Sequence, residues 1–226
     1  MPGAIFSPQV IITLGRMFSA MIAVLSLETT TICTETNSPS NPDRALNPLN
    51  SPVEWIFAYG SLVWRPGFEF EYSTLAELRG WKRQFSQGSP DHRGTPESPG
   101  RVLTLTADER ASCQGIAYRI ALSQIEPIME YLDVRESGGY SRQLVGVQLN
   151  NGQVVQALTY IALPENPHAC HGETLDTLIE LIKTRHGPSG SNLDYVLNLA
   201  STLAKHGIED AELARVVSLL EAEYQP

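Results

Sequence analysis

The chain has 226 residues, enough for one good-sized domain with a hydrophobic core and a short additional segment. Its 16 Lys and Arg against 25 Asp and Glu give a formal net charge of -9. Such a surface repels phosphate backbones and is not attracted to anionic membranes, so we expect no nucleic-acid or membrane partner. Cys33, Cys113 and Cys170 are odd in number and far apart. They form no disulfide framework and favour a reducing compartment, and we expect the cytoplasm.

Near the start of the chain, residues 10–27 are largely apolar, but Arg16 interrupts them and leaves 17–27 as the longest apolar run. A run of this length is too short to cross a bilayer as a helix. With Arg16 as its charged flank it suits the core of a signal peptide, although residues 28–34 lack the small-x-small cleavage pattern. We favour an extension without function and keep secretion as the alternative.

Residues 37–52 are rich in Pro, Asn and Ser and predict a disordered linker. Apolar residues become frequent directly after it, near Glu54. We therefore predict an N-terminal extension and linker over 1–52 and a single folded domain over 53–226.

The first half of this domain reads as strands. Residues 55–59 are a continuous apolar run, typical of a strand buried on both faces. Residues 101–106 alternate in polarity and predict a second strand, and 114–120 predict a third after a polar turn. Further along, 143–149 and 154–161 predict two strands joined by an Asn-Asn-Gly hairpin turn.

One helix is expected between these strands. Ser123 has the character of an N-cap, and Glu126 three residues later completes the pattern of a capping box. Apolar residues follow at helical spacing: Ile125, Ile128, Met129 and Leu132. We expect the helix to end before the glycine pair Gly138 and Gly139.

The last third of the chain shows three more apolar stripes at helical spacing. They are Leu175, Leu178, Ile179 and Ile182; Leu193, Val196, Leu197 and Ala200; and Leu213, Val216, Val217 and Leu220. Strands first and helices last, with one helix inserted, predict an α+β fold.

The tetrapeptide Tyr59-Gly60-Ser61-Leu62 follows the buried strand directly. Because Gly60 has no Cβ, a ligand can approach the backbone there, and the amides of such a turn can bind a carboxylate. The Ser61 hydroxyl adds a donor or acceptor. The alternative is an ordinary turn with Ser61 bonded to a local backbone group, which the tetrapeptide taken alone favours.

Glu136 lies between the predicted helix and the glycine pair that turns the chain. If its carboxylate faces a cavity, desolvation raises its pKa towards neutrality, which suits a group that transfers protons. The alternative is a solvated glutamate paired with Arg135 or Arg142.

The polar loop from Gln87 to Arg101 offers Arg93 and Arg101, whose guanidinium groups can bind a substrate carboxylate through two hydrogen bonds. His92 is weak evidence by itself. The cluster His168, Cys170 and His171 is too tightly spaced for zinc, and nothing else in the sequence supplies a second ligand pair. We therefore expect no metal site.

Six motifs in order resemble the ChaC-like family of glutathione-specific γ-glutamylcyclotransferases. They are YGSLVW at 59–64, QGSPDHRG at 87–94, PGRVLTL at 99–105, GIAYRI at 115–120, YLDVRESGGY at 131–140 and GPSGSNLDYV at 187–196. Each motif is weak alone, but six in order make the resemblance specific. It runs from about Trp55 to the C-terminus and does not cover residues 1–52.

The resemblance implies a small, partly closed β-barrel with helices around it. It also implies a lyase that converts glutathione to 5-oxoproline and cysteinylglycine without a cofactor, as a monomer or weak dimer. Glu136 is the expected acid/base, and the turn amides are expected to bind the γ-glutamyl group. The expected substrate-binding residues are Ile56, Phe57, Ala58, Tyr59, Gly60, Ser61, Leu62, Arg93, Arg101 and Tyr140.

Two alternatives stay open at this point. The first is a cyclotransferase for other γ-glutamyl dipeptides or γ-glutamylamines, although the QGSPDHRG loop resembles the glutathione-specific group. The second is a non-catalytic regulatory or binding protein that keeps the pocket. Glu136 argues against it, because a protein that only binds has no need of the carboxylate.

Overall fold

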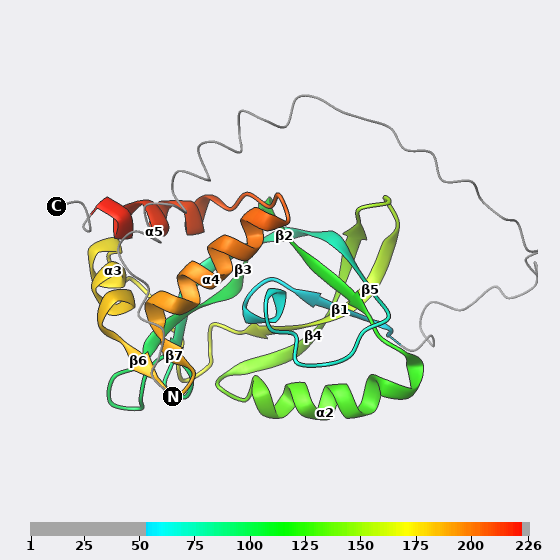
Figure 1. Ribbon diagram of the computed structural model, residues 1–226, viewed down its shortest axis with the longest axis horizontal. Coiled ribbons are helices and arrows are strands. Elements are labelled where there is room, and N and C mark those ends of the chain that lie inside the picture. Colours follow the sequence, from blue (N-terminus) through cyan, green and yellow to red (C-terminus); the bar gives the residue numbers. More distant parts are fainter. Residues whose placement is uncertain (1–52, 223–226) are drawn as a thin grey trace, which may run out of the picture.

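A five-stranded closed β-barrel forms the centre of the molecule (Figure 1). The computed structural model describes residues 53–222, so the expected extension and linker at 1–52 lie outside the described residues. The strands are β1 (Trp55–Ala58), β2 (Tyr72–Ser89), β3 (Gly100–Arg119), β4 (Tyr140–Leu149) and β5 (Val154–Ala162). Their order is β1-β3-β2-β4-β5, and parallel pairing of β5 with β1 closes the ring.

The barrel is closed, whereas the family resemblance implied a partly closed one. Two of its strand pairings are short, however. β1 pairs with β5 through two residue pairs, and β2 pairs with β4 through two. The predicted α+β class is confirmed. The predicted hairpin is also confirmed, with Gly152 in its turn at φ 85°.

Strand β1 is buried on both faces, as its apolar run predicts. Ile56 and Ala58 join the larger hydrophobic cluster, against which the helices pack, and Phe57 and Tyr59 join a second cluster. Ile56 and Phe57 are both fully buried. The strand thus packs into both hydrophobic clusters, and this packing fixes the position of the turn that follows Ala58.

The prediction of a polar turn between two strands at 101–106 and 114–120 was wrong. β3 is one strand of 20 residues that pairs with an 18-residue β2. The register shifts between the pairs Arg79–Ser112 and Trp81–Ala107, with Gly80 at φ 81°. The polar residues between these pairs are mostly exposed on an irregular part of the ladder, so their polarity reports exposure and not a chain reversal.

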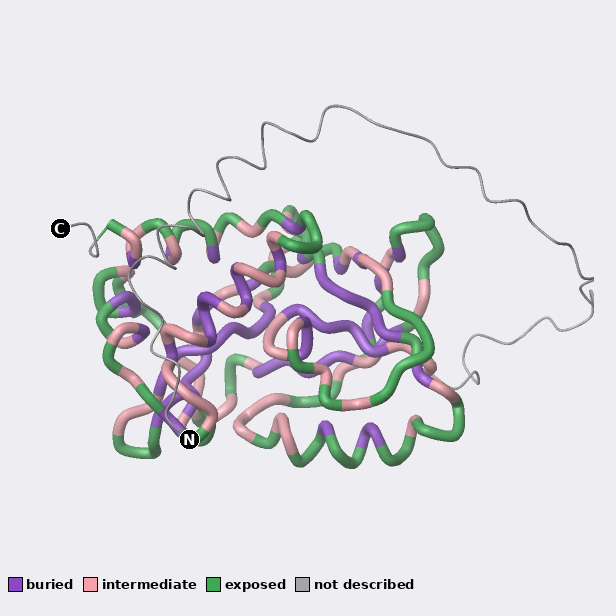
Figure 2. The backbone as a smooth tube through the Cα atoms, in the orientation of Figure 1, coloured by how far each residue is buried: buried purple, intermediate pink, exposed green. Residues whose placement is uncertain are grey.

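The helices are α2 (Ile125–Arg135), α3 (Leu175–Thr184), α4 (Asn192–Lys205) and α5 (Ala211–Ala222). Each predicted apolar stripe lies at least partly in the core. Figure 2 shows the buried residues of α2 on the side that faces the barrel. Helices α3, α4 and α5 lie together on one side of the molecule, where α3 and α4 contact β3 (Figure 1).

The predicted capping box at Ser123 was wrong. Ser123 lies inside a short 3₁₀ helix, η2 (Leu122–Gln124), and Gln124 precedes α2 without a side-chain cap. An N-cap needs an extended backbone, and the 3₁₀ turn already holds Ser123 in a helical path. A capping box does occur elsewhere, between Ser191 and Asp194 at the start of α4.

The short strands β6 (His186–Gly187) and β7 (Gly190–Ser191) form a separate hairpin directly before α4. Of the helices between residues 53 and 222, none is both long and apolar enough to cross a membrane.

Deletion of residues 1–52 is expected to leave the folded domain intact, because residues 55–220 of the described part of the chain by themselves form two extensive hydrophobic clusters. The melting temperature should stay within about 2 °C, less than the shift that 1 kcal/mol typically produces in a domain of this size. Differential scanning calorimetry of the full chain and of a form starting at Val53 measures this. A clearly lower melting temperature for the shorter form would show that the removed segment packs on the domain.

Candidate active site

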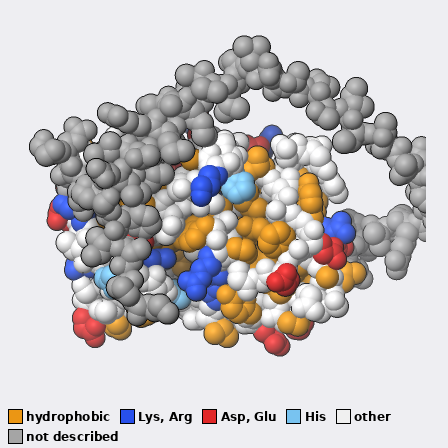
Figure 3. Space-filling view, in the orientation of Figure 1, with side chains coloured by type: hydrophobic (Ala, Val, Ile, Leu, Met, Phe, Trp, Pro, Cys, Tyr) orange, Lys and Arg blue, Asp and Glu red, His pale blue; other side chains and the backbone are white. Residues whose placement is uncertain are grey.

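A cavity of about 550 Å³ opens beside the turn that follows β1. This volume is typical of small-molecule sites. Its wall includes the end of β1 with the turn after it, the end of β2 with its loop, the C-terminal end of α2, and residues of β3, β4, β5 and α4. On the face of the molecule shown in Figure 3, hydrophobic side chains gather near the middle, with Lys or Arg side chains beside them.

Most of the residues predicted from the sequence line this cavity. Those on its wall are Phe57, Ala58, Tyr59, Gly60, Ser61, Leu62, Arg93, Glu136 and Tyr140. Segments far apart in the sequence therefore meet at one place, as the resemblance implied.

Two predicted residues are not on the wall. Ile56 is fully buried in the larger hydrophobic cluster. Arg101 forms a two-pronged ion pair with Glu173, with Nη2–Oε1 at 2.6 Å and Nε–Oε2 at 2.8 Å. The structure corrects both assignments: Ile56 belongs to the core, and the guanidinium of Arg101 is already paired with a carboxylate of the protein.

The turn itself contains the 3₁₀ helix η1 (Ser61–Val63), and all of its carbonyl groups have partners. Arg83 Nε donates to the Tyr59 carbonyl at 2.8 Å. The Val63 amide donates to Gly60 O, and the amides of residues 64 and 65 donate to Ser61 O. The hydroxyl of Tyr118 contacts the last two carbonyls, of Leu62 and Val63, at 3.1 and 3.2 Å.

The amides of the same turn behave differently. Among residues 53–222, no oxygen atom accepts a hydrogen bond from the N–H groups of Gly60, Ser61 or Leu62. A Cβ built on Gly60 would meet only the Tyr195 hydroxyl, at 3.6 Å, so the space in front of this residue is open. A turn with every acceptor used and three donors free is suited to bind an anion, and a carboxylate in particular.

Glu136 lies at the C-terminal end of α2, and its amide donates to Leu132 O at 2.8 Å. Its side chain is 16% exposed, and Oε1 lies 3.3 Å from Arg135 Nε. The carboxylate is therefore largely withdrawn from water; it pairs with Arg135, as the alternative expected, but it is not the solvated side chain of that alternative. Arg142 pairs instead with Asp133.

Burial raises the pKa of Glu136, and this effect outweighs the neighbouring charges. Arg135 and His92 lower the pKa of this carboxyl, and Asp91 raises it. Three tyrosines of the wall remain protonated, because burial raises the pKa of Tyr195 to about 12 and raises those of Tyr59 and Tyr140 well above their usual value. Glu136 is therefore a stronger proton acceptor than a solvated glutamate carboxylate.

The chain turns away from Glu136 through Gly138 and Gly139; the backbone of Gly139 favours glycine, and a side chain at position 138 would displace Asp91. A Cβ on Gly138 would lie 2.6 Å from Asp91 Oδ2, and Gly139 has φ 100°. The buried side chain of Gln87 donates to Gly138 O at 2.9 Å and so holds this turn against the end of β2.

Sequence reasoning missed the role of Arg135, which joins the two parts of the site. Its Nη2 donates to Ser61 Oγ at 3.1 Å, and its Nη1 donates to Arg65 O at 2.7 Å. The same guanidinium lies 3.3 Å from Glu136 Oε1, so a single side chain spans the turn and the carboxylate. The sequence signal was the Arg-Glu pair itself, which was considered only as a surface ion pair.

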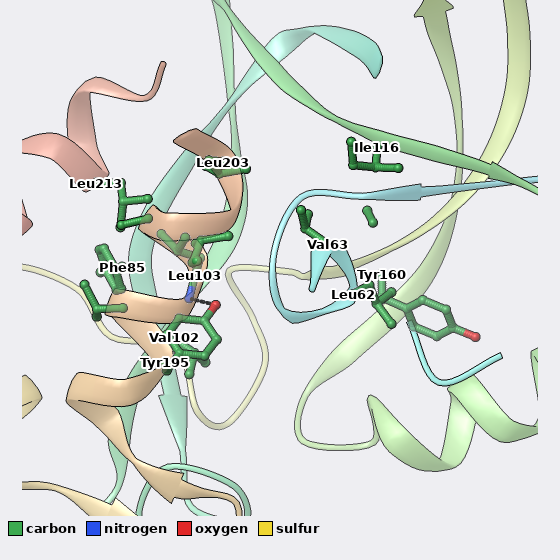
Figure 4. Packing of buried hydrophobic residues seen from close by; sticks show 14 of the residues in the cluster. Leu62, Val63, Phe85, Val102, Leu103, Ile116, Tyr160, Tyr195, Leu203 and Leu213 are labelled. Carbon is green, nitrogen blue, oxygen red and sulfur yellow. Dashed lines mark hydrogen bonds between the residues drawn. The ribbon is translucent and has the colours of Figure 1, made fainter. Parts of the chain in front are cut away.

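His92 also lies on the wall and connects three segments. Its Nδ1 is 3.0 Å from Ser189 Oγ, and its Nε2 is 3.3 Å from Arg135 O. Tyr195, from α4, reaches the same cavity, and its hydroxyl accepts a hydrogen bond from the Leu103 amide at 3.2 Å (Figure 4). The spacing of these residues along the chain gave no indication that they meet.

Residues 53–222 contain no group of three His, Cys, Asp or Glu side chains placed to hold a metal ion. In the cluster near residue 170, the Cys170 thiol contacts His168 O at 3.4 Å, and His171 Nε2 lies 3.4 Å from Pro164 O. These side chains contact the backbone.

A closed barrel with a buried carboxylate on the wall of a cavity, beside a turn of unpaired amides, defines a class of small-molecule site that binds an anion and transfers a proton. Comparison with known proteins makes the class specific. The family model described as "ChaC-like protein" matches residues 54–223. The chain belongs to this ChaC-like family.

Relatives and solved structures agree with this. Glutathione-specific gamma-glutamylcyclotransferase 1 of Danio rerio is 37% identical over 76% of this chain and 91% of its own length. The human protein of the same name is 35% identical over 81% of this chain and 90% of its own length. A crystal structure of a glutathione-specific γ-glutamylcyclotransferase from yeast superimposes with a TM-score of 0.69 at 28% identity, covering 76% of this chain and 96% of that one.

The raised pKa of Glu136 has a consequence for stability. A carboxyl whose pKa is higher in the folded than in the unfolded state favours folding fully below the unfolded pKa, and this contribution is lost as pH rises through the folded pKa. Gln cannot ionise, so Glu136→Gln should melt at or above the wild-type temperature at pH 8, with a smaller difference at pH 4. Thermal unfolding at both pH values measures this.

Asp133→Asn is the matched control, because hydrogen bonds from Tyr160 and Arg142 lower the pKa of Asp133. Its effect should have the opposite sign, a small loss at pH 8 that fades towards acid. A Glu136→Gln variant that loses more stability at pH 8 than at pH 4 would contradict the assignment of a desolvated carboxylate.

Proposed function

We propose that this protein is a glutathione-specific γ-glutamylcyclotransferase, which cleaves glutathione to 5-oxoproline and cysteinylglycine with Glu136 as general acid/base. One observation carries the proposal: Glu136 and residues 60–62, whose amides are unpaired, line one cavity, and Arg135 contacts both Glu136 and Ser61. The named relatives act on the same substrate, as their names state.

The γ-glutamyl end of glutathione carries an α-carboxylate and an α-amino group on one carbon. The amides of Gly60, Ser61 and Leu62 supply donors for the carboxylate, and Ser61 Oγ is held in place by Arg135. A substrate fixed in this way has its α-amino group beside the carboxylate of Glu136. Its γ-carbonyl is then within reach of the same amino group.

The reaction is an intramolecular substitution. The α-amino nitrogen attacks the γ-carbonyl carbon, and the new C–N bond closes a five-membered lactam. The bond from that carbon to the cysteine nitrogen then breaks. Glu136 accepts the proton that the amine loses and delivers a proton to the departing nitrogen, so it ends the cycle in its starting state.

This chemistry places few demands on the protein beyond position and proton transfer. The nucleophile is tethered to the carbon that it attacks, so the folded conformer of the substrate supplies much of the rate enhancement. The reaction consumes no water, nucleotide or second substrate. The Tyr195 hydroxyl accepts from Leu103 N–H and keeps its own proton, which makes it a candidate donor to the developing oxyanion.

Arg93 is the candidate for the glycine carboxylate of the tripeptide. It is 9% exposed, its Nη1 donates to Ser191 O at 3.1 Å, and its guanidinium lies 5.6 Å from the Tyr195 ring centroid. No carboxylate of a described residue forms an ion pair with it. Asp194 lies near enough to raise the pKa of Arg93 but does not pair with it. A desolvated cation on a cavity wall that has no ion-pair partner favours an anionic ligand.

The alternatives from the sequence are weaker beside this geometry. A cyclotransferase for short γ-glutamyl dipeptides needs no cation beyond the γ-glutamyl site, and a protein that only binds needs no desolvated carboxylate. Cytoplasmic location and a monomer or weak dimer belong to the same proposal. Two free thiols, Cys113 and Cys170, and a cavity wall completed by one chain support them.

Replacement of Glu136 by Gln tests the catalytic role. The amide keeps the shape of the carboxylate but cannot accept the proton, so turnover should fall by about 10²–10⁴-fold. Release of 5-oxoproline from glutathione, followed by chromatography, measures it, and calorimetric binding of glutathione checks that the site persists. Activity within a few-fold of wild type would remove Glu136 from the mechanism.

Arg93→Ala tests selectivity, with Arg101→Ala as a matched control whose guanidinium is paired with Glu173. We expect Arg93→Ala to raise KM for glutathione about tenfold or more, the loss of one charge-assisted contact, and to spare γ-glutamyl-alanine. Arg101→Ala should leave the KM ratio of the two substrates unchanged. If Arg93→Ala raises KM equally for both substrates, the result would favour a cyclotransferase for short γ-glutamyl dipeptides.

A further inference from the structure

We infer that Arg83 is a positioning residue for substrate binding: it fixes the peptide group between Tyr59 and Gly60 so that the Gly60 N–H points into the cavity. The inference rests on the proposed use of the turn amides to bind the α-carboxylate. Arg83 is not part of the cavity wall, so it acts through the backbone and not by contact with the substrate.

Arg83 lies in β2 with a side chain that is 1% exposed, and each of its nitrogens has a partner. Nε donates to Tyr59 O at 2.8 Å, and Nη1 donates to Asp210 Oδ2 at 2.9 Å. Nη2 donates to the carbonyl of Gln114 in β3. The guanidinium thus connects the start of the turn to two strands and to the residue before α5.

The geometry of the peptide bond links this contact to the cavity. A peptide group is planar and trans, so its C=O and N–H point in opposite directions. Because the Tyr59 carbonyl points to the buried Arg83, the Gly60 N–H of the same group points away from Arg83, and Gly60 itself lines the cavity. Rotation of this group would cost the hydrogen bond to a buried guanidinium.

A second contact holds the other end of Tyr59. Its hydroxyl donates to Tyr160 O at 2.7 Å, and the residue is 5% exposed. With its side chain fixed in one direction and its carbonyl in another, Tyr59 leaves little freedom to the turn that follows. The charge of Arg83 also withdraws electron density from the peptide group, which strengthens its N–H as a donor.

Asp210 extends this arrangement to the C-terminal helix. Its Oδ2 pairs with Arg83, and its Oδ1 accepts the Leu213 amide at 2.9 Å, at the start of α5. One carboxylate therefore caps the helix and pairs with Nη1 of the arginine, on the opposite side of the guanidinium from the Nε that contacts Tyr59 O. The competing explanation is that the Arg83–Asp210 pair only attaches α5 to β2 and has no part in binding.

Arg83→Lys separates the two explanations. Lysine has a methylene group where arginine has Nε, so the variant lacks the donor to Tyr59 O but keeps a cation near Asp210. Asp210→Asn is the matched control: it removes the ion pair, keeps Nε on Tyr59 O, and leaves an amide oxygen to cap α5.

We expect Arg83→Lys to raise KM about tenfold for glutathione and equally for γ-glutamyl-alanine, because both substrates share the γ-glutamyl group. The turn amides bind ground state and transition state alike, so kcat should change little. The Kd of 5-oxoproline, measured by calorimetry without turnover, should rise by the same factor. Asp210→Asn should lower the melting temperature and leave KM and this Kd within about twofold.

Unchanged KM and Kd in Arg83→Lys, or equal changes in both variants, would overturn the inference and leave the pair a purely structural link. Wild-type protein that binds 5-oxoproline but does not turn over glutathione would refute the proposed function alone. If the lysine variant fails to fold, the ¹⁵N resonance spectrum of wild type and Asp210→Asn decides. The Gly60 amide should shift downfield on addition of 5-oxoproline in both, and the lack of a shift would refute the inference.

Discussion

The site depends on how the backbone hydrogen bonds are distributed in the turn after β1. Every carbonyl from Tyr59 to Val63 is satisfied by donors of the protein, whereas the amides of residues 60–62 have no acceptor among the described residues. Backbone polar groups away from water need partners, so a turn with this imbalance is suited to bind an anion. Its acceptors are satisfied by the buried residues Arg83 and Tyr118 and by the turn itself.

The second requirement is a carboxylate desolvated enough to act as a base but not so isolated that it is always protonated. Burial raises the pKa of Glu136, and Arg135 and His92 moderate the rise. Arg135 also donates to Ser61 Oγ, so the group that tunes the carboxylate also fixes its position relative to the turn. In the proposed mechanism, proton transfer and substrate position are therefore coupled through one guanidinium, which the barrel holds in a rigid frame.

Sequence reasoning succeeded where one local rule decides. Continuous apolar residues predicted β1, apolar stripes predicted the helices, and an Asn-Asn-Gly turn predicted the β4–β5 hairpin. It failed for β2, where Arg83 and Gln87 occupy buried positions that a pattern rule reserves for apolar residues. Both are buried because they bond to backbone groups of distant segments, Tyr59 O and Gly138 O, which no local pattern reveals.

The sequence by itself determined the fold class, the family and the position of Glu136 at the end of a helix, since these follow from periodicity and from ordered motifs. It did not distinguish Arg93 from Arg101, two arginines of the same loop. The tertiary structure decided between them by pairing Arg101 with Glu173 and leaving Arg93 on the cavity wall. The physical reason is that the role of a charged side chain depends on the groups it contacts. The contact of Arg101 with Glu173 spans 72 residues of sequence, and that of Arg93 with Ser191 spans 98.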